Sequence, residues 1–151
     1  MKVTVLLRRD HETLRGLMDE IGTKERRKLN GKTVFQKIKN EHQIHSQMAS
    51  EVFYSALAAT PSDRAVELVA SAQQSCQAVE RLFQELSRMN PSDKNFDTKM
   101  NAVITEIGRH IEMEEDELFH EARKAFPEHR LEELGLEMQD RRNTLKMLAV
   151  V

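Results

Sequence analysis

The chain has 151 residues, the size of a single domain, and can bury a hydrophobic core without disulfides. Charged residues make up 32% of the sequence, but the formal net charge is only −2, so no excess of positive charge indicates a nucleic-acid partner. The single cysteine, Cys76, excludes an internal disulfide, and the first apolar run is too short for a signal peptide or a membrane span, so we expect a reduced, soluble, cytoplasmic protein with no membrane partner.

The spacing of apolar residues predicts helices throughout and no strand, since no run alternates with a period of two. The expected helices cover residues 3–21, 33–58, 61–89 and 96–126, and a short fifth helix opens at Pro127. The basic segment TKERRKLNGK, residues 23–32, is expected to form a loop. Four long amphipathic helices with short connections predict an all-α, antiparallel up-down-up-down four-helix bundle with a short C-terminal fifth helix.

The fourth helix carries two His and five carboxylates within HIEMEEDELFH, residues 110–120. His110 and Glu114 are spaced i and i+4 and fall on the apolar stripe, whereas Glu115 is expected to face solvent with the other acids. An inward His alone is more often a hydrogen-bonded core residue than a metal ligand. An inward Glu one turn later favours a ligand, because an unpaired buried charge is very costly.

Two further histidines, His11 and His45, interrupt the apolar stripes of the first and second helices. The separation from His11 to His45 is 34 residues, and so is the separation from Cys76 to His110. This equal spacing indicates that the first two helices are a duplicate of the next two. Imidazoles and carboxylates on facing helices are the usual way in which bundles build iron sites.

These motifs resemble the hemerythrin-like family of HHE cation-binding domains. The resemblance extends over most of the chain and is carried by DHETLRGL, EVFYSAL, HIEMEEDELF and LEELGLEMQDR. The pattern of that family is His followed by His-x-x-x-Glu, and then the same again. The resemblance implies one hemerythrin-like domain over residues 1–151 and a pair of non-heme iron ions within a four-helix bundle.

The resemblance also implies ligands. His11 and His45 would serve one iron, His110 would serve the other, and Glu114 would bridge the two. The chain departs from the pattern at two positions, because Ala49 stands where the family has its first bridging Glu and Cys76 stands where it has the third-helix His.

The remaining set, His11, His45 and Glu114, suits a single Fe(II) with open positions. Cys76 is interpreted either as a thiolate ligand, which favours iron or Zn, or as a small buried apolar residue. One or two non-heme iron ions, with Zn as another possibility, are therefore the expected cofactors. Gln73 and Glu117 border the space left at Ala49 and are weak candidates for the missing ligand.

The function indicated by the resemblance is iron binding, with dioxygen, nitric oxide or peroxide as the small ligand. Two alternatives stay open. One is a bundle that has lost its metal and acts as a structural or protein-interaction module, and the other is an enzyme that degrades peroxide. The sequence identifies no protein partner.

Overall fold

The computed structural model describes residues 1–150, except for the side chains of residues 24–26, 29–30 and 149–150. Every regular element in these residues is a helix. The elements are α1 (Val3–Glu20), α2 (Lys24–Met48), η1 (Ala49–Tyr54), α3 (Ser55–Ala58), α4 (Asp63–Ser87), α5 (Lys94–Met113), η2 (Glu114–Leu118), α6 (Phe119–Ala125) and α7 (Glu128–Val150). Local sequence sets two of the helix starts. The Ser62 hydroxyl accepts a hydrogen bond from the Ala65 amide at the start of α4, and Asp93 accepts one from the Asn95 amide at the start of α5.

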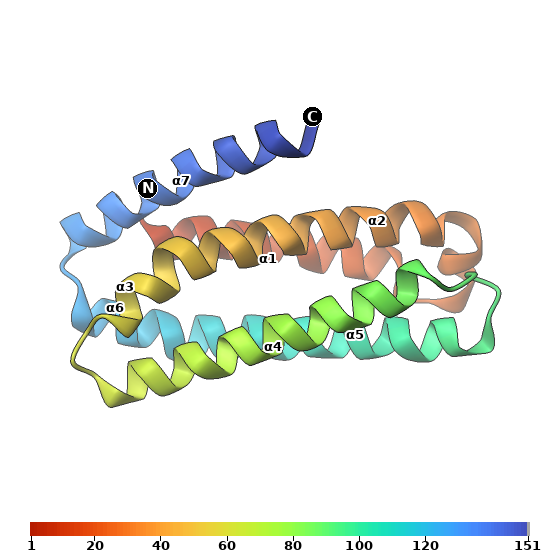
Figure 1. Ribbon diagram of the computed structural model, residues 1–151, viewed down its shortest axis with the longest axis horizontal. Coiled ribbons are helices and arrows are strands. Elements are labelled where there is room, and N and C mark those ends of the chain that lie inside the picture. Colours follow the sequence, from red (N-terminus) through yellow and green to blue (C-terminus); the bar gives the residue numbers. More distant parts are fainter. Residues whose placement is uncertain (151) are drawn as a thin grey trace.

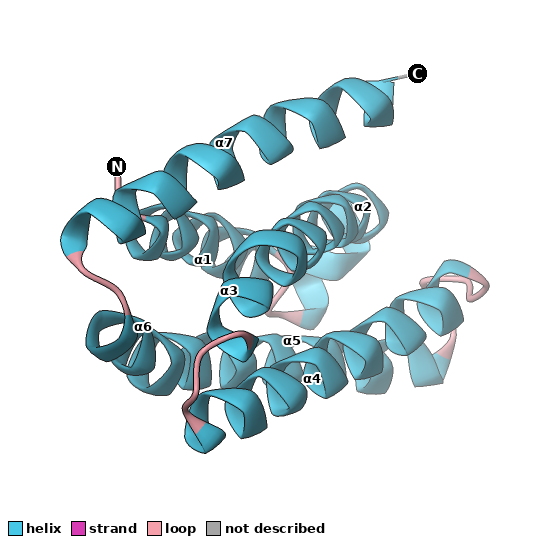
Figure 2. Cartoon of the chain, turned by 60° about the vertical axis from the view of Figure 1, so that its left-hand side comes forward, coloured by secondary structure: helices cyan, strands magenta, loops and turns pink. Residues whose placement is uncertain are grey.

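The helices form four antiparallel rods and one additional helix (Figure 1). The rods are α1, the run α2–η1–α3, α4, and the run α5–η2–α6. Helix α7 lies across the side of the bundle formed by α1 and α2, and its C-terminal end diverges from α2 (Figure 2). The expected all-α bundle with antiparallel helices and a fifth helix is confirmed.

Two element bounds differ from the sequence prediction. Helix α2 begins at Lys24 instead of residue 33, because the basic segment is rich in residues with high helix propensity. Arg27 within it is buried and donates to the Ile21 carbonyl at 2.8 Å and to Asp97 Oδ1 at 3.0 Å, which ties α2 to α1 and α5. The fifth helix was expected to be short, but α7 has 23 residues.

Two stretches of π-helix, η1 and η2, continue α2 and α5 without a break. In a π-helix the hydrogen bonds run from i to i+5, so a turn contains more residues than in an α-helix and the following side chains change direction. Both stretches lie next to the inward-facing polar residues, η1 four residues after His45 and η2 beginning at Glu114. Such segments are frequent at functional sites.

The apolar core consists of two clusters separated by a polar layer. One contains Leu7, Phe53, Leu57 and Phe119, and the other contains Leu14, Phe35, Phe83 and Ile107. On three of the rods, buried polar residues fall between these clusters: Asp10 and His11, His42 and His45, and His110 and Glu114. Within the described residues, no helix has the length and apolar character needed to cross a membrane.

Candidate metal centre

A layer of buried polar side chains crosses the middle of the bundle. Four of the five candidate ligands meet there: His11 from α1, His45 from α2, His110 from α5, and Glu114 from the first residue of η2. Each is at most 4% exposed. A polar layer in an apolar core is costly unless its members are paired or bind an ion.

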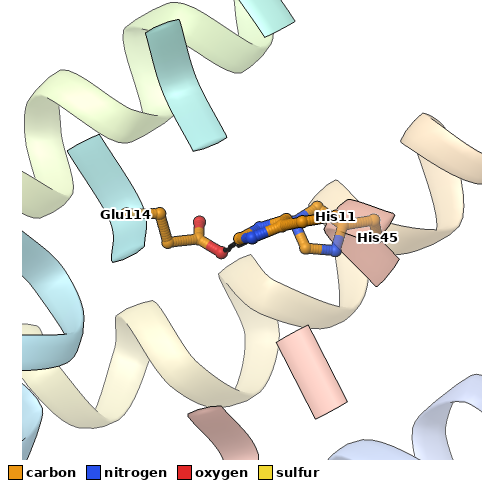
Figure 3. Close-up of side chains that lie close together, drawn as sticks. All are labelled: His11, His45 and Glu114. Carbon is orange, nitrogen blue, oxygen red and sulfur yellow. Dashed lines mark hydrogen bonds and ion pairs between the residues drawn. The ribbon is translucent and has the colours of Figure 1, made fainter. Parts of the chain in front are cut away.

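Glu114 contacts histidines from three helices, and its carboxylate faces His11 and His45 (Figure 3). Its Oε1 lies 2.9 Å from His11 Nε2 and 3.6 Å from His45 Nε2. Its Oε2 lies 3.1 Å from His110 Nε2 and accepts a hydrogen bond from the Tyr54 hydroxyl. The two oxygens therefore face different groups, with Oε1 toward His11 and His45 and Oε2 toward His110 and Tyr54.

The donor atoms of His11, His45 and Glu114 all lie within 4.8 Å of one another. Among the described residues no other group of His, Cys, Asp or Glu side chains meets this condition, and neither His110 nor Cys76 belongs to the trio. His45 Nε2 is buried and has no hydrogen-bond partner, although it forms an ion pair with Glu114 Oε1 at 3.6 Å. His110 Nδ1 is likewise buried without a hydrogen-bond partner. An unpartnered buried nitrogen beside a carboxylate and a second imidazole fits a cation-binding position.

The outer nitrogens of the two histidines are held by carboxylates. His45 Nδ1 lies 2.9 Å from Asp10 Oδ2, and His11 Nδ1 lies 2.6 Å from Glu115 Oε2. Glu115 was expected to face solvent, but its side chain is only 16% exposed. The expectation was wrong because Glu115 faces α1, where its carboxylate contacts His11, Arg8 and Arg15.

Burial and neighbouring charges shift the pKa values of Glu114 and His45 in opposite directions. Burial acts to raise the pKa of Glu114, but hydrogen bonds with His11 and His110 and the nearby positive charge of His45 outweigh it and hold that pKa well below its usual range. Burial acts to lower the pKa of His45, but the carboxylates of Asp10 and Glu114 outweigh it and raise that pKa to about 9. Without a metal, the centre therefore contains a buried carboxylate opposite a protonated imidazole.

Tyr54 is a member of the site that sequence reasoning missed. It is 1% exposed, lies within hydrogen-bond distance of His110 Nε2 (3.1 Å), and donates to Glu114. Burial and the neighbouring Glu114 carboxylate keep the pKa of Tyr54 well above its usual value, so the phenol retains its proton. Tyr54 follows His45 by nine residues, and an ideal α-helix would turn it to about the opposite face. The π-helix η1, which separates the two, changes that direction.

Neither Gln73 nor Glu117, the weak sequence candidates for the missing ligand, has a contact with Glu114. Gln73 is exposed in a groove between α2 and α4, and Glu117 forms an ion pair with Arg64 at 3.0 Å on the surface.

Cys76 lines the same groove, which has a volume of about 670 Å³ and also exposes parts of His42, Ser46 and Tyr54. Cys76 is half-buried, and burial raises the pKa of its thiol to about 11, although a hydrogen bond with Ser46 acts in the other direction. A neutral thiol is a poor metal ligand. His42 is buried against Phe83, with ring centroids 5.4 Å apart, and burial lowers its pKa to about 3.

Comparison with known proteins agrees with this geometry. Residues 2–122 match the model of the hemerythrin HHE cation binding domain. The fold is similar to the crystal structure of a hemerythrin HHE cation binding domain-containing protein from Mycobacterium kansasii, with a TM-score of 0.81 and 22% sequence identity over 99% of this chain and 90% of that chain. No curated protein matches the chain. The match over residues 2–122 includes all the residues of the polar layer, and the chain belongs to the hemerythrin HHE cation binding domain family.

Proposed function

We propose that this protein binds a single non-heme iron ion through His11 Nε2, His45 Nε2 and a carboxylate oxygen of Glu114. The observation that carries the proposal is that donor atoms of His11, His45 and Glu114 all lie within 4.8 Å of one another in the buried layer. His45 Nε2 and His110 Nδ1 are both buried without a hydrogen-bond partner, but His45 Nε2 is the one that faces the Glu114 carboxylate, in an ion pair longer than a hydrogen bond. A cation bound to the lone pair of His45 Nε2 would account for this geometry.

The surroundings of the two histidines support this assignment. Asp10 and Glu115 accept from the Nδ1 atoms of His45 and His11, so the Nε2 atoms are the ones left to bind a metal. Two imidazoles and one carboxylate are a set that suits Fe(II) with open positions. Zn accepts the same donors, so the identity of the metal has to be measured.

Occupancy by one ion is favoured over two. Ala49 offers no carboxylate, and Glu114 Oε2 is already engaged by Tyr54 and His110. On that side, the positions that bind metal in the family pattern hold only His110 and Cys76, and the Cys76 thiol is protonated. A second ion would have to break the hydrogen bond from Tyr54 to Glu114.

Reduced iron with open positions binds dioxygen, nitric oxide or peroxide, and we propose such a small molecule as the ligand. The protein residues supply the rest of the environment. The two apolar clusters exclude water from both ends of the layer. The groove lined by Tyr54, His42 and Cys76 opens at the surface next to Tyr54, whose hydroxyl contacts Glu114 Oε2.

The proposal is tested by thermal unfolding of the purified protein with a chelator and with Fe(II) under anaerobic conditions. A metal that binds only the folded state stabilises it by RT ln(1 + [L]/Kd), about 2.7 kcal/mol at a hundredfold excess over Kd. We expect a higher midpoint with Fe(II) for the wild type and no shift for His45→Ala. Identical wild-type midpoints in both conditions would contradict the proposal.

The alternative of a metal-free structural bundle has one observation in its favour. Both oxygens of Glu114 have hydrogen-bond partners without any metal, namely His11 on one side, and His110 and Tyr54 on the other. Under this alternative His45→Ala should not alter the response to Fe(II), because the wild type would show none. The same unfolding experiment therefore separates the two functions.

A further inference from the structure

Arg142, on the fifth helix, reaches into the bundle and pairs with Asp10. Its side chain is 15% exposed and that of Asp10 is 7% exposed, so the contact is largely shielded from solvent. Arg142 lies beyond residues 2–122, the part that matches the family model. We propose that Arg142 is a positioning residue that acts through Asp10 to hold the His45 ring with Nε2 directed at Glu114. The expected loss of metal affinity in Arg142→Gln rests on the proposed metal-binding function.

Asp10 uses its two oxygens for two different partners. Oδ1 accepts from Arg142 Nη2, and Oδ2 lies 2.9 Å from His45 Nδ1. A carboxylate held at both oxygens cannot turn about its own side-chain bonds without losing one contact. Because a buried carboxylate is costly when it loses its counter-charge, Arg142 keeps Asp10 both charged and oriented.

The orientation of Asp10 in turn decides that of His45. The hydrogen bond at Nδ1 fixes which edge of the ring faces Asp10, and the opposite edge then presents Nε2 to Glu114 at 3.6 Å. The ring also lies edge-on to His11, with the centroids 5.1 Å apart and the planes 63° apart. Residues beyond the first ligands of a metal commonly control ligand orientation and affinity in this way.

The neighbouring residue provides a matched control. Arg141 also links α7 to the bundle, through Glu51, with Nη2 lying 3.2 Å from Glu51 Oε1. This pair is much more exposed, at 34% and 41%, and has no contact with a candidate ligand. Helix α7 is further held by the buried side chains of Leu131, Leu134, Met138 and Leu145. Removing either arginine therefore removes one link between α7 and the bundle, but of the two only Arg142 is connected to His45, through Asp10.

The first measurement needs no metal. Nuclear Overhauser contacts between the rings of His45 and His11 report their relative orientation in the metal-free protein. We expect Arg142→Gln to weaken these contacts and Arg141→Gln to leave them at wild-type intensity. Equal intensities in both variants would overturn the proposed role of Arg142, whether or not the protein binds metal.

The second measurement is the affinity for Co(II), used as a spectroscopic substitute for Fe(II) and followed by competition with a chromophoric chelator. Arg142→Gln should weaken binding on the order of tenfold, the lower end of the range for residues that orient metal ligands. Arg141→Gln should bind as the wild type does, and Arg142→Lys should restore part of the loss. If the wild type takes up no Co(II), the proposed function fails, and the ring contacts still decide the role of Arg142.

A double-mutant cycle separates positioning from a general loosening of α7. If Arg142 acts through Asp10, adding Arg142→Gln to Asp10→Asn should cause no further loss of Co(II) affinity. Losses that add in full would mean that Arg142 acts by another route and would overturn the proposal. Metal-free unfolding midpoints of the single variants show whether each one is folded at the temperature of the titration.

Discussion

Gly135 marks the place where α7 comes closest to the start of the chain. A Cβ atom added there would lie 1.9 Å from the carbonyl oxygen of Met1 and 3.1 Å from the backbone nitrogen of Val3. Both atoms belong to the backbone, so no side-chain rotation relieves the contact. The substitution Gly135→Ala therefore forces α7 away from the N-terminal end of α1.

The size of the effect follows from a comparison with other helical glycines. At Gly16 and Gly108, an added Cβ meets no atom within 4 Å. Alanine at these two positions should stabilise the protein by about 1 kcal/mol, the difference in helix propensity. At Gly135 the same gain is opposed by an overpacking cost of about 1–3 kcal/mol. Because the propensity term cancels, Gly135→Ala should be less stable than Gly108→Ala by about 1–3 kcal/mol.

Urea unfolding followed by far-ultraviolet circular dichroism measures this difference directly, and thermal midpoints should differ by about 2–4 °C per kcal/mol for a domain of this size. Gly16→Ala is the second control and should behave as Gly108→Ala does. Equal stability of Gly135→Ala and Gly108→Ala would refute the close packing of α7 against the N-terminal backbone. It would also weaken the placement of Arg142 beside Asp10, which depends on the same docking.

Three further predictions concern the polar layer. Because the pKa of His45 is raised to about 9 without metal, a metal must displace the proton of His45 at pH 7. The apparent affinity for Co(II) should therefore rise by about tenfold per pH unit from pH 7 and level off above pH 9. A flat profile in competition titrations would contradict this. Burial raises the pKa of the Cys76 thiol to about 11, so alkylation by iodoacetamide should be slow at pH 7 and should accelerate as the pH approaches 11. A fast reaction at neutral pH would indicate a thiolate available to a metal. Ala49→Glu adds a carboxylate one turn after His45, so it should raise the number of metal ions bound per chain above the wild-type value, as measured by elemental analysis. Ala49→Gln is the neutral control. An unchanged number in both variants would argue against a vacant second position.

Much of the fold followed from helical periodicity. The stripes on the rods are regular, and the turns at Ser62 and Asp93 have capping residues that are visible in the sequence. The start of α2 was missed because the basic segment has no apolar stripe. Arg27, whose guanidinium is buried among groups from α1 and α5, tethers that helix through contacts distant in sequence, such as that with Asp97.

The inward directions of His11, His45, His110 and Glu114 were also predictable, since each interrupts an apolar stripe at helical spacing. Tyr54 was not, because the π-helix η1 turns it toward the polar layer, and an α-helical pattern contains no sign of this change. Glu115 was missed because its contact with His11 depends on how α1 packs against η2.

Asp10 and Arg142 were missed for different reasons. Asp10 directly precedes His11, and an acid beside a candidate ligand could have been considered as an orienting residue. Its pairing with Arg142 depends on how α7 docks, which no local pattern specifies.

The most direct test of the proposed centre is the number of iron ions retained per chain after anaerobic loading with Fe(II) and removal of unbound metal by gel filtration. The wild type should retain one iron ion per chain. His45→Ala should retain almost none, because it removes one of the three side chains whose donor atoms converge at the site. No retained iron in the wild type, or equal amounts in the wild type and in His45→Ala, would contradict the assignment of His11, His45 and Glu114 as an iron site.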